Sequence, residues 1–368
     1  MEVPPMEQQP TADELTVSII INNYNYDRFL AEAIDSALNQ TYPNIEVIVV
    51  DDGSTDSSRQ IIAGYGDAIT PVLQPNSKQG IAFNNGFNHS TGDIIIFLDA
   101  DDYLEPQAAA NIVAAWQPGL AKIHYRLRVV DAQGQPSGVS YPQANRLSQG
   151  DLTQIVINFG SYAGVPTSGN ALSRTAMTQV FPIPEAFKTT ADDYLSVLMP
   201  LYGQVEAIEE PLGNYRIHTN NQWALATFSC DRFRRFIRHD IQRCELLKHR
   251  AAALGYTVPP DLEYRFFGRV WSRLASLKLE PEQHPVATDR AIALSYWGIR
   301  AILKYSGFNS SKKLLYSLWF IWVGMMPRPL AKPAIVWLLA PQFRPKPIQQ
   351  ILIRFRTAIS WDAGEISQ

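Results

Sequence analysis

The sequence predicts an open α/β fold, with a mostly parallel sheet flanked by helices and a mainly helical C-terminal extension. Three short, apolar, largely β-branched runs, 16–21, 45–50 and 94–98, indicate strands buried on both faces. Stretches with helical periodicity separate these runs, and such alternation is typical of a doubly wound sheet. At 368 residues the chain is too long for one typical domain.

The helix after the first strand has the clearest pattern, because Leu30, Ala33, Ile34, Ala37 and Leu38 repeat at helical spacing within residues 27–40. Weaker patterns predict further elements in chain order: helices at 57–63, 81–89, 108–116 and 189–202, and strands at 124–130 and 206–217. From residue 231 onward the pattern is helical, with helices expected at 231–254, 264–279 and 288–304.

The last part of the chain differs in charge and hydropathy. Residues 300–368 hold ten Lys or Arg and two Asp or Glu, a net charge of +8 within a chain of −3. The uncharged runs 314–327 and 333–343 are both shorter than the ~20 residues of a straight spanning helix. Cations and tryptophans beside such runs favour a membrane interface, although a pair of core helices would give the same pattern. The overall charge does not indicate nucleic-acid binding.

These patterns divide the chain into four segments. We expect a flexible arm at 1–14 and an α/β domain at 15–225. A helical region at 226–311 and a basic, apolar, membrane-associating tail at 312–368 follow.

Polar clusters follow the first two predicted strands, at the edge where open α/β sheets bind ligands. Asn22, Asn23, Tyr24 and Asn25 come first, and Tyr24 is suited to stacking on a base. Asp51 and Asp52 begin the second cluster, where a carboxylate can accept hydrogen bonds from a base or a ribose. Turns and helix caps use the same residue types, which is the alternative interpretation of both clusters.

A third cluster, Asp99, Asp101 and Asp102, follows the strand 94–98. Three carboxylates within four positions repel one another unless a cation neutralises them. Mg²⁺ and Mn²⁺ prefer carboxylate oxygens and are often shared with substrate phosphates. The cluster therefore indicates a metal–diphosphate site, although a solvated acidic turn would also contain such residues.

Two long stretches together resemble family 2 glycosyltransferases of the GT-A fold. They are VSIIINNYNYDRFLAEAIDSALNQTYPNIEVIVVDDGSTD and TGDIIIFLDADDYLEP, and later matches are TSGNALSR, ADDY and EEPLGNYRIH. The resemblance covers about residues 15–220 and makes 15–225 a catalytic domain.

The resemblance implies a nucleotide-sugar donor site. Tyr24 then helps to hold the base, Asp52 contacts the uridine and Asp99 lies near the ribose. The family's usual Pro-Thr is Asn22-Asn23 here, which keeps the polarity but loses the rigid turn. The family's Arg-Asn pair before the third strand is replaced here by Phe83-Asn84, so Lys78 is the candidate for the missing phosphate or sugar contact.

The resemblance also implies a metal and a base. Asp101 corresponds to the ligand for Mg²⁺ or Mn²⁺, and His218 is expected to bind the metal or the diphosphate. The family's Glu-Asp pair is Asp192-Asp193 here, which makes Asp193 the base and leaves Asp192 as the other candidate.

The predicted activity is metal-assisted, inverting transfer of a sugar from a nucleotide-sugar to a hydroxyl of a glycan or lipid-linked acceptor. The resemblance favours UDP over dTDP or GDP. We expect a cytoplasmic enzyme, peripheral on the inner face of the cell membrane. A sugar-phosphate nucleotidyltransferase and a non-catalytic nucleotide- or carbohydrate-binding module are the alternatives. The former needs a Gly-rich loop that 22–27 lacks, and the latter would have lost one of Asp52, Asp101 and Asp193.

Overall fold

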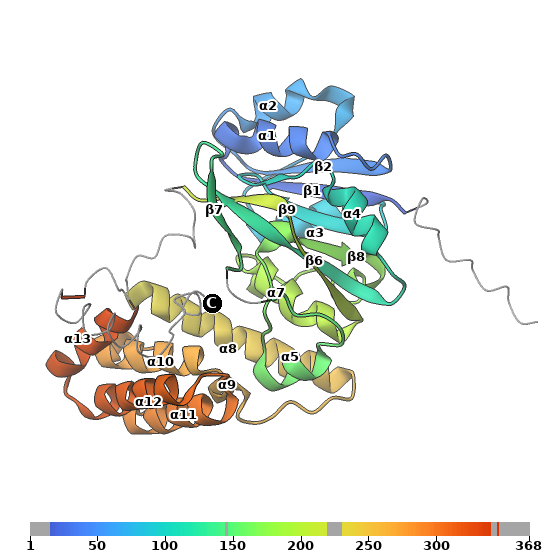
Figure 1. Ribbon diagram of the computed structural model, residues 1–368. Coiled ribbons are helices and arrows are strands. Elements are labelled where there is room, and N and C mark those ends of the chain that lie inside the picture. Colours follow the sequence, from blue (N-terminus) through green and yellow to red (C-terminus); the bar gives the residue numbers. More distant parts are fainter. Residues whose placement is uncertain (1–14, 144–145, 219–229, 340–343, 346–368) are drawn as a thin grey trace, which may run out of the picture. The chain divides into compact units, whose positions relative to one another are not determined.

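The computed structural model describes residues 15–143, 146–218, 230–339 and 344–345 (Figure 1). The chain forms two compact units: residues 1–153 with 162–218, and residues 154–161 with 219–368. The predicted arm 1–14 lies outside the described residues, as do 340–343 and 346–368 of the predicted tail.

The described residues of the first unit form one nine-stranded sheet in the order β3-β2-β1-β4-β8-β6-β9-β5, with β7 beside β6. The strands are β1 (Val17–Asn23), β2 (Ile45–Asp52), β3 (Thr70–Gln74), β4 (Ile94–Asp99), β5 (Tyr103–Leu104), β6 (Leu120–Val130), β7 (Pro136–Tyr141), β8 (Asn170–Ser173) and β9 (Gln204–Arg216). Strands β3, β2, β1 and β4 are parallel, as are β6 and β9, while β8 runs antiparallel to both β4 and β6. The predicted α/β fold with a mostly parallel sheet is confirmed.

Helices cover both faces of this sheet. They are α1 (Asp27–Leu38), α2 (Ser58–Gly64), α3 (Gln79–His89), α4 (Ala108–Ala115), α6 (Arg174–Met177) and α7 (Ala191–Leu198). The apolar stripe of α1 shares one core with Ile19 and Ile21 of β1. On α3, a Cβ at Gly86 would lie 2.4 Å from Ile20 Cγ2, so α3 packs closely on the opposite face. Successive side chains of a strand point to opposite faces, which explains why β1 reads as an unbroken apolar run.

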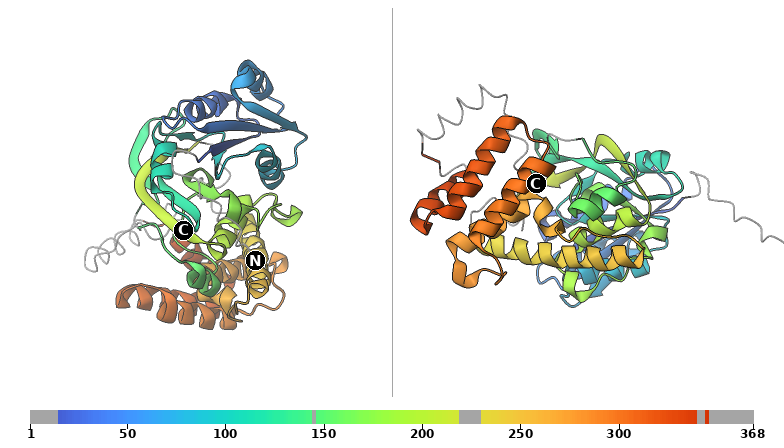
Figure 2. Two further views of the ribbon diagram at one scale, coloured as in Figure 1. Left: turned by 90° about the vertical axis from the view of Figure 1, so that its right-hand side faces the viewer. Right: turned by 90° about the horizontal axis from the view of Figure 1, so that it is seen from below.

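The second unit is helical. Its helices are α5 (Thr153–Phe159), α8 (Cys230–Ala253), α9 (Leu262–Arg265), α10 (Phe267–Leu279), α11 (Ala291–Tyr305), α12 (Ser310–Met325) and α13 (Arg328–Leu339). Helices α11, α12 and α13 are the orange-red part of Figure 2. Leu274, Leu294, Phe320 and Ile335 come from four of these helices and are buried in one core. The sequence predicts a separate tail from residue 312, whereas α12 shares its buried side with α10 and α11. No helix among the described residues is both long and apolar enough to cross a membrane.

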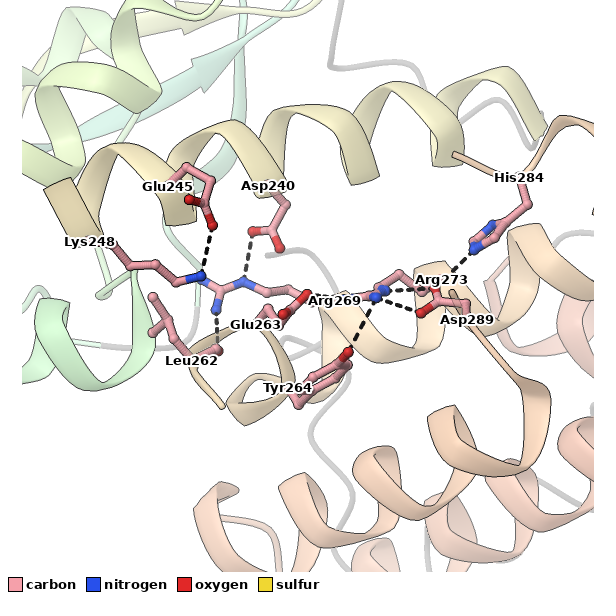
Figure 3. Close-up of polar contacts among 10 residues, drawn as sticks. All are labelled: Asp240, Glu245, Lys248, Leu262, Glu263, Tyr264, Arg269, Arg273, His284 and Asp289. Atoms are coloured by element: carbon pink, nitrogen blue, oxygen red, sulfur yellow. Dashed lines mark hydrogen bonds and ion pairs between the residues drawn. The ribbon is translucent and has the colours of Figure 1, made fainter. Parts of the chain in front are cut away.

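Two buried arginines of α10 connect the segments of the second unit (Figure 3). Arg269 forms an ion pair of 2.7 Å with Asp240 of α8 and donates a hydrogen bond of 2.6 Å to the carbonyl of Phe159. Arg273 donates to Asp289 at 2.8 Å, and the imidazole of His284 lies 2.9 Å from the same carboxylate. A buried guanidinium is tolerated when carboxylates and carbonyls surround it, and loss of one partner is strongly destabilising. The contacts indicate a structural network.

Candidate active site

The candidate site lies at the carboxyl ends of the first parallel strands. The chain runs outward from β1 to β2 and β3, and then returns to the other side of β1 as β4. This reversal creates the crevice in which open α/β sheets bind ligands. The strand register brings Asn22 of β1 beside Asp99 of β4, and Asn23 beside Asp51 of β2. The three predicted clusters therefore meet at one edge.

Asp51 joins the loops that follow β1 and β2. Its carboxylate accepts hydrogen bonds from Asn23 Nδ2 at 3.0 Å, the Ser54 N–H at 3.1 Å and Arg59 Nε at 2.9 Å. Burial alone would raise the pKa of Asp51, but these hydrogen bonds lower it below its ordinary value. Asp51 is therefore a supporting residue, in line with the turn interpretation of this cluster.

Asp52 holds the loop that follows β3. Gln74 Nε2 donates to its carboxylate at 2.7 Å, the Ser77 N–H at 2.6 Å and the Lys78 N–H at 2.9 Å. Lys78 has a positive φ of 74°, which turns the chain so that its N–H points at Asp52. The Lys78 ammonium lies 6.0 Å from the centre of the half-exposed Tyr24 ring. The structure thus brings Tyr24, Asp52 and Lys78 together.

Asn22 carries a buried acceptor. Its Oδ1 is shielded from solvent and receives no hydrogen bond from the described residues. Buried polar atoms usually have a partner, so an unpaired one beside a ligand-binding crevice is consistent with a ligand contact.

The acidic cluster is tied to the end of β9. Asp101 Oδ2 lies 2.9 Å from His218 Nε2, and both side chains are largely buried. Asp102 accepts a hydrogen bond of 2.6 Å from Ser168 Oγ and one of 2.9 Å from the Arg216 N–H. The ring of His218 packs against Phe29 with 5.0 Å between centroids, which fixes the imidazole beside Asp101.

The cluster carries more negative charge than its surroundings neutralise. Burial and the charges of Asp101 and Asp192 raise the pKa of Asp99 to about 8. Burial and the charges of Asp101 and Asp99 also raise the pKa of Asp102 well above its ordinary value. A divalent cation would remove this repulsion, and oxygen and imidazole ligands suit Mn²⁺ or Mg²⁺. Within the described ranges, no three His, Cys, Asp or Glu side chains are grouped as a complete metal site.

The acidic pair opens helix α7. Asp192 is exposed, and it lines a small cavity with Phe97, Lys122 and Thr167, among others. Its charge also contributes to the raised pKa of Asp99, which brings it into the electrostatic environment of the acidic cluster. Asp193 is partly exposed on the first turn of the same helix.

Comparison with known proteins identifies the family. Residues 18–160 match the family described as glycosyl transferase family 2. An uncharacterized glycosyltransferase of Nostoc sp. is 37% identical over 221 residues, which cover 58% of this chain and 68% of the relative. This chain belongs to glycosyl transferase family 2. It is therefore a glycosyltransferase, and the nucleotidyltransferase and non-catalytic alternatives are set aside.

Two further comparisons show how much of the chain is similar to other proteins in sequence and in structure. An uncharacterized glycosyltransferase of Rickettsia typhi is 47% identical over 90 residues, which cover 24% of this chain and 28% of the relative. The crystal structure of S. aureus TarS 1–349 in complex with UDP-GlcNAc has a TM-score of 0.51 with 14% identity, covering 90% of this chain and 93% of that chain. This second likeness supports the GT-A fold.

Sequence reasoning missed one central residue of this family 2 glycosyltransferase, Arg216. Its side chain is buried, donates to the carbonyl of Asp101 at 2.8 Å and forms an ion pair with Glu32 of α1. The guanidinium also lies 4.7 Å from the centre of the Phe29 ring. An arginine two positions before His218, at the end of a predicted strand, was the available signal, but its partners come from distant segments.

Proposed function

We propose that this enzyme moves a sugar from a nucleotide-sugar, with UDP-sugars as the first choice, to a hydroxyl of a glycan or lipid-linked acceptor. The observation that carries the proposal is the acidic cluster at the crevice between β1 and β4. Burial and mutual repulsion raise the pKa of Asp99 and of Asp102 in this cluster, and such carboxylates are typical of a site that works with a cation bound. A diphosphate leaving group is the substrate feature that needs such a cation.

The proposed metal ligands are Asp101 and His218, with Asp99 in the same charged cluster. When bound, Mg²⁺ or Mn²⁺ would stabilise the negative charge that develops on the departing diphosphate. Two protein ligands suffice for this role, because Mg²⁺ in particular is often held by one or two carboxylates together with substrate phosphates.

The proposed donor site is formed by Asn22, Tyr24, Asp52, Lys78 and Asp99. Tyr24 has the exposure that stacking on a base requires, and Lys78 brings a positive charge beside it. Asp52 already receives one hydrogen bond from the end of β3 and two from the loop after it, so it also positions Lys78. The unpaired Asn22 Oδ1 would accept a hydrogen bond from the donor. TarS was crystallised with UDP-GlcNAc, and UDP-sugars are therefore tested first.

The proposed base is Asp193, which would take the proton of the acceptor hydroxyl. Asp193 is partly exposed on the first turn of α7, so its carboxylate is accessible to a hydroxyl of the acceptor. Asp192 is the second candidate. One base and direct displacement of the diphosphate would invert the configuration at the anomeric carbon.

The proposed location is the cytoplasmic side of the cell membrane, with the protein peripheral on its surface. The excess of basic residues after residue 300 and the apolar runs at 314–327 and 333–343 support this proposal.

A thermal-shift screen tests the proposed donor. The full chain is heated with UDP-, dTDP- and GDP-sugars, each with and without Mn²⁺. We expect a UDP-sugar to raise the melting temperature most, and to do so only with the metal present. Equal shifts with all three nucleotides would contradict the UDP assignment. An increase in melting temperature that is the same with and without Mn²⁺ would contradict the proposed role of the metal.

A further inference from the structure

Helix α12 exposes a row of apolar side chains on the side opposite its core contacts. Tyr316, Phe320 and Val323 are buried against the rest of the second unit. The exposed row recurs at spacings of four, three and four, which keeps it on one side of the helix: Leu314, Leu318, Ile321 and Met325. Leu314 is 61% exposed and Met325 is 68% exposed, so nothing among the described residues covers the row.

Helix α11 continues the same surface. Ile292, Tyr296 and Leu303 are exposed, and Ile292 reaches 77%. Their positions on the helical wheel lie next to the side of α11 that packs on α12. The two helices are in close contact there, since Ser295 Oγ donates to the carbonyl of Phe320 at 2.8 Å. We call the two exposed rows together the outer face.

The segment that holds α11, α12 and α13 carries charges of one sign. The sequence from Ala291 to Leu339 contains no aspartate or glutamate. It contains six cations, all within these helices: Arg300, Lys304, Lys312, Lys313, Arg328 and Lys332. Arg300 forms an ion pair with Asp261, which lies outside this stretch. A surface exposed only to water normally carries charges of both signs and few large apolar side chains.

We propose that the outer face of α11 and α12 is the surface by which this enzyme lies on an anionic lipid bilayer. The apolar rows enter the headgroup region while the cations contact anionic lipids, as in helices that lie in the interface plane. Because α12 buries its other side in the protein core, it lies along the membrane surface. Trp322 is half-exposed beside the row, and its Nε1–H is already paired with the carbonyl of Leu330 at 3.1 Å, which suits an interfacial position.

This inference rests on the proposed peripheral location and adds the surface that produces it. The proposed membrane surface includes α11, which ends before residue 312, so it begins earlier in the chain than the predicted tail. The occupant is a lipid surface, since the stretch 291–339 carries cations and no acidic residue, which matches the charge of anionic headgroups. A second copy of this chain would bring the same six cations against themselves.

Vesicle sedimentation of the full chain tests the proposal. The vesicles contain phosphatidylcholine alone, or phosphatidylcholine with about 30% phosphatidylglycerol. Leu314→Gln, Leu318→Gln and Met325→Gln are combined in one apolar variant, and Lys312→Gln, Lys313→Gln and Arg328→Gln in one charge variant. A matched control combines Leu73→Gln and Ile155→Gln, which alter exposed apolar residues of β3 and α5 instead of α11 and α12. The melting curve and the UDP-induced shift of each variant report the fold and the donor site separately.

We expect the native chain and the control to sediment with anionic vesicles. The apolar variant should lose at least about tenfold in affinity. The charge variant should lose roughly fivefold per cation, and its binding should depend less on salt than that of the native chain. A native chain that stays in the supernatant overturns both the location and the outer face. Binding that the apolar variant retains overturns the outer face alone. A concentration-dependent dimer that this variant abolishes, with no vesicle binding, would make the face an interface between copies.

Discussion

At the scale of single residues, neighbouring aspartates have different partners and different roles. Asp51 connects two loops, whereas Asp52 fixes the loop that carries Lys78. Asp101 is beside His218, while the adjacent Asp102 is held by Ser168 and the backbone of Arg216. The sequence predicted the edge of the sheet at which these acidic residues gather. It could not separate supporting from substrate-facing carboxylates, because their hydrogen-bond partners lie far away in the chain.

The raised pKa of Asp99 predicts a dependence of stability on pH. Its carboxyl has a pKa of about 8 in the fold against an ordinary value of 3.8, so the folded state holds a proton that the unfolded state releases. The stability contributed by this proton is complete below pH ~4 and is lost as pH rises towards ~8. In metal-free protein, Asp99→Asn should therefore be more stable than the native chain at pH 8, by an amount on the order of a few kcal/mol.

Urea denaturation at pH 5 and pH 8 measures this effect. The difference between Asp99→Asn and the native chain should shrink at the lower pH. A difference that is the same at both values would show that Asp99 is already ionised in the fold.

The two members of the acidic pair are separable by kinetics. Asp193→Asn should lower kcat by about 10²–10⁴-fold, because it removes the acceptor for the hydroxyl proton. Donor affinity should stay near the native value. Asp192→Asn should have the smaller effect on kcat and should shift the pH dependence through Asp99, whose pKa it helps to raise. Steady-state kinetics across pH distinguishes the two, and a larger loss of kcat in Asp192→Asn would reverse the roles.

At the scale of elements, the spacing of apolar residues was sufficient to predict the long helices and the buried strands. The predicted strand 94–98 is β4, and the predicted helix 231–254 is α8 within one residue at each end. Strand β7 was missed, because its residues Pro136–Tyr141 are mostly exposed and lie in a segment that reads as turns. Helix α5 was missed because its centre, Ile155-Val156-Ile157, is a β-branched run that is more typical of a strand.

The contact between α11 and α12 depends on a glycine. A Cβ at Gly298 would lie 2.2 Å from the ring of Phe320, so a larger residue must displace this buried ring or push the two helices apart. We expect Gly298→Ala to lower the free energy of unfolding by about 1–3 kcal/mol, despite the better helix propensity of alanine. Gly307→Ala is the matched control, because no atom lies within 4 Å of its Cβ position. Equal stability of the two variants in chemical denaturation would show that the helices separate easily.

At the scale of the whole molecule, the chain joins a GT-A unit to a helical unit with its own core. The sequence indicated the change from alternating to helical patterns near residue 225. It left open whether the apolar runs of the predicted tail meet a membrane or form a pair of core helices. An uncharged run in the sequence looks the same whether it packs on other helices or on a membrane. One side of α12 packs on other helices, and its opposite side is exposed.

Truncation distinguishes core from tail. A chain that ends at residue 345 retains α12 and α13, and its helical unit should melt as in the full chain. A chain that ends at residue 309 uncovers Val270 and Leu274 of α10, because Phe320 and Val323 are gone. It should bind a dye for exposed apolar surface and lose helical signal at a lower temperature. If instead the shorter chain keeps a native melting curve, α12 adds nothing to the core.

The central claim is that the acidic cluster is a cation-dependent donor site, and calorimetry of UDP binding tests it most directly. With Mn²⁺ present, the native chain should bind UDP at least about tenfold more tightly than without it. Asp101→Asn should lose this enhancement, while its metal-free melting temperature stays close to that of the native chain. Asp67 is an exposed aspartate, and the control Asp67→Asn should keep the enhancement by Mn²⁺. UDP affinity that is indifferent to Mn²⁺ in the native chain, or an enhancement that survives in Asp101→Asn, would contradict the account.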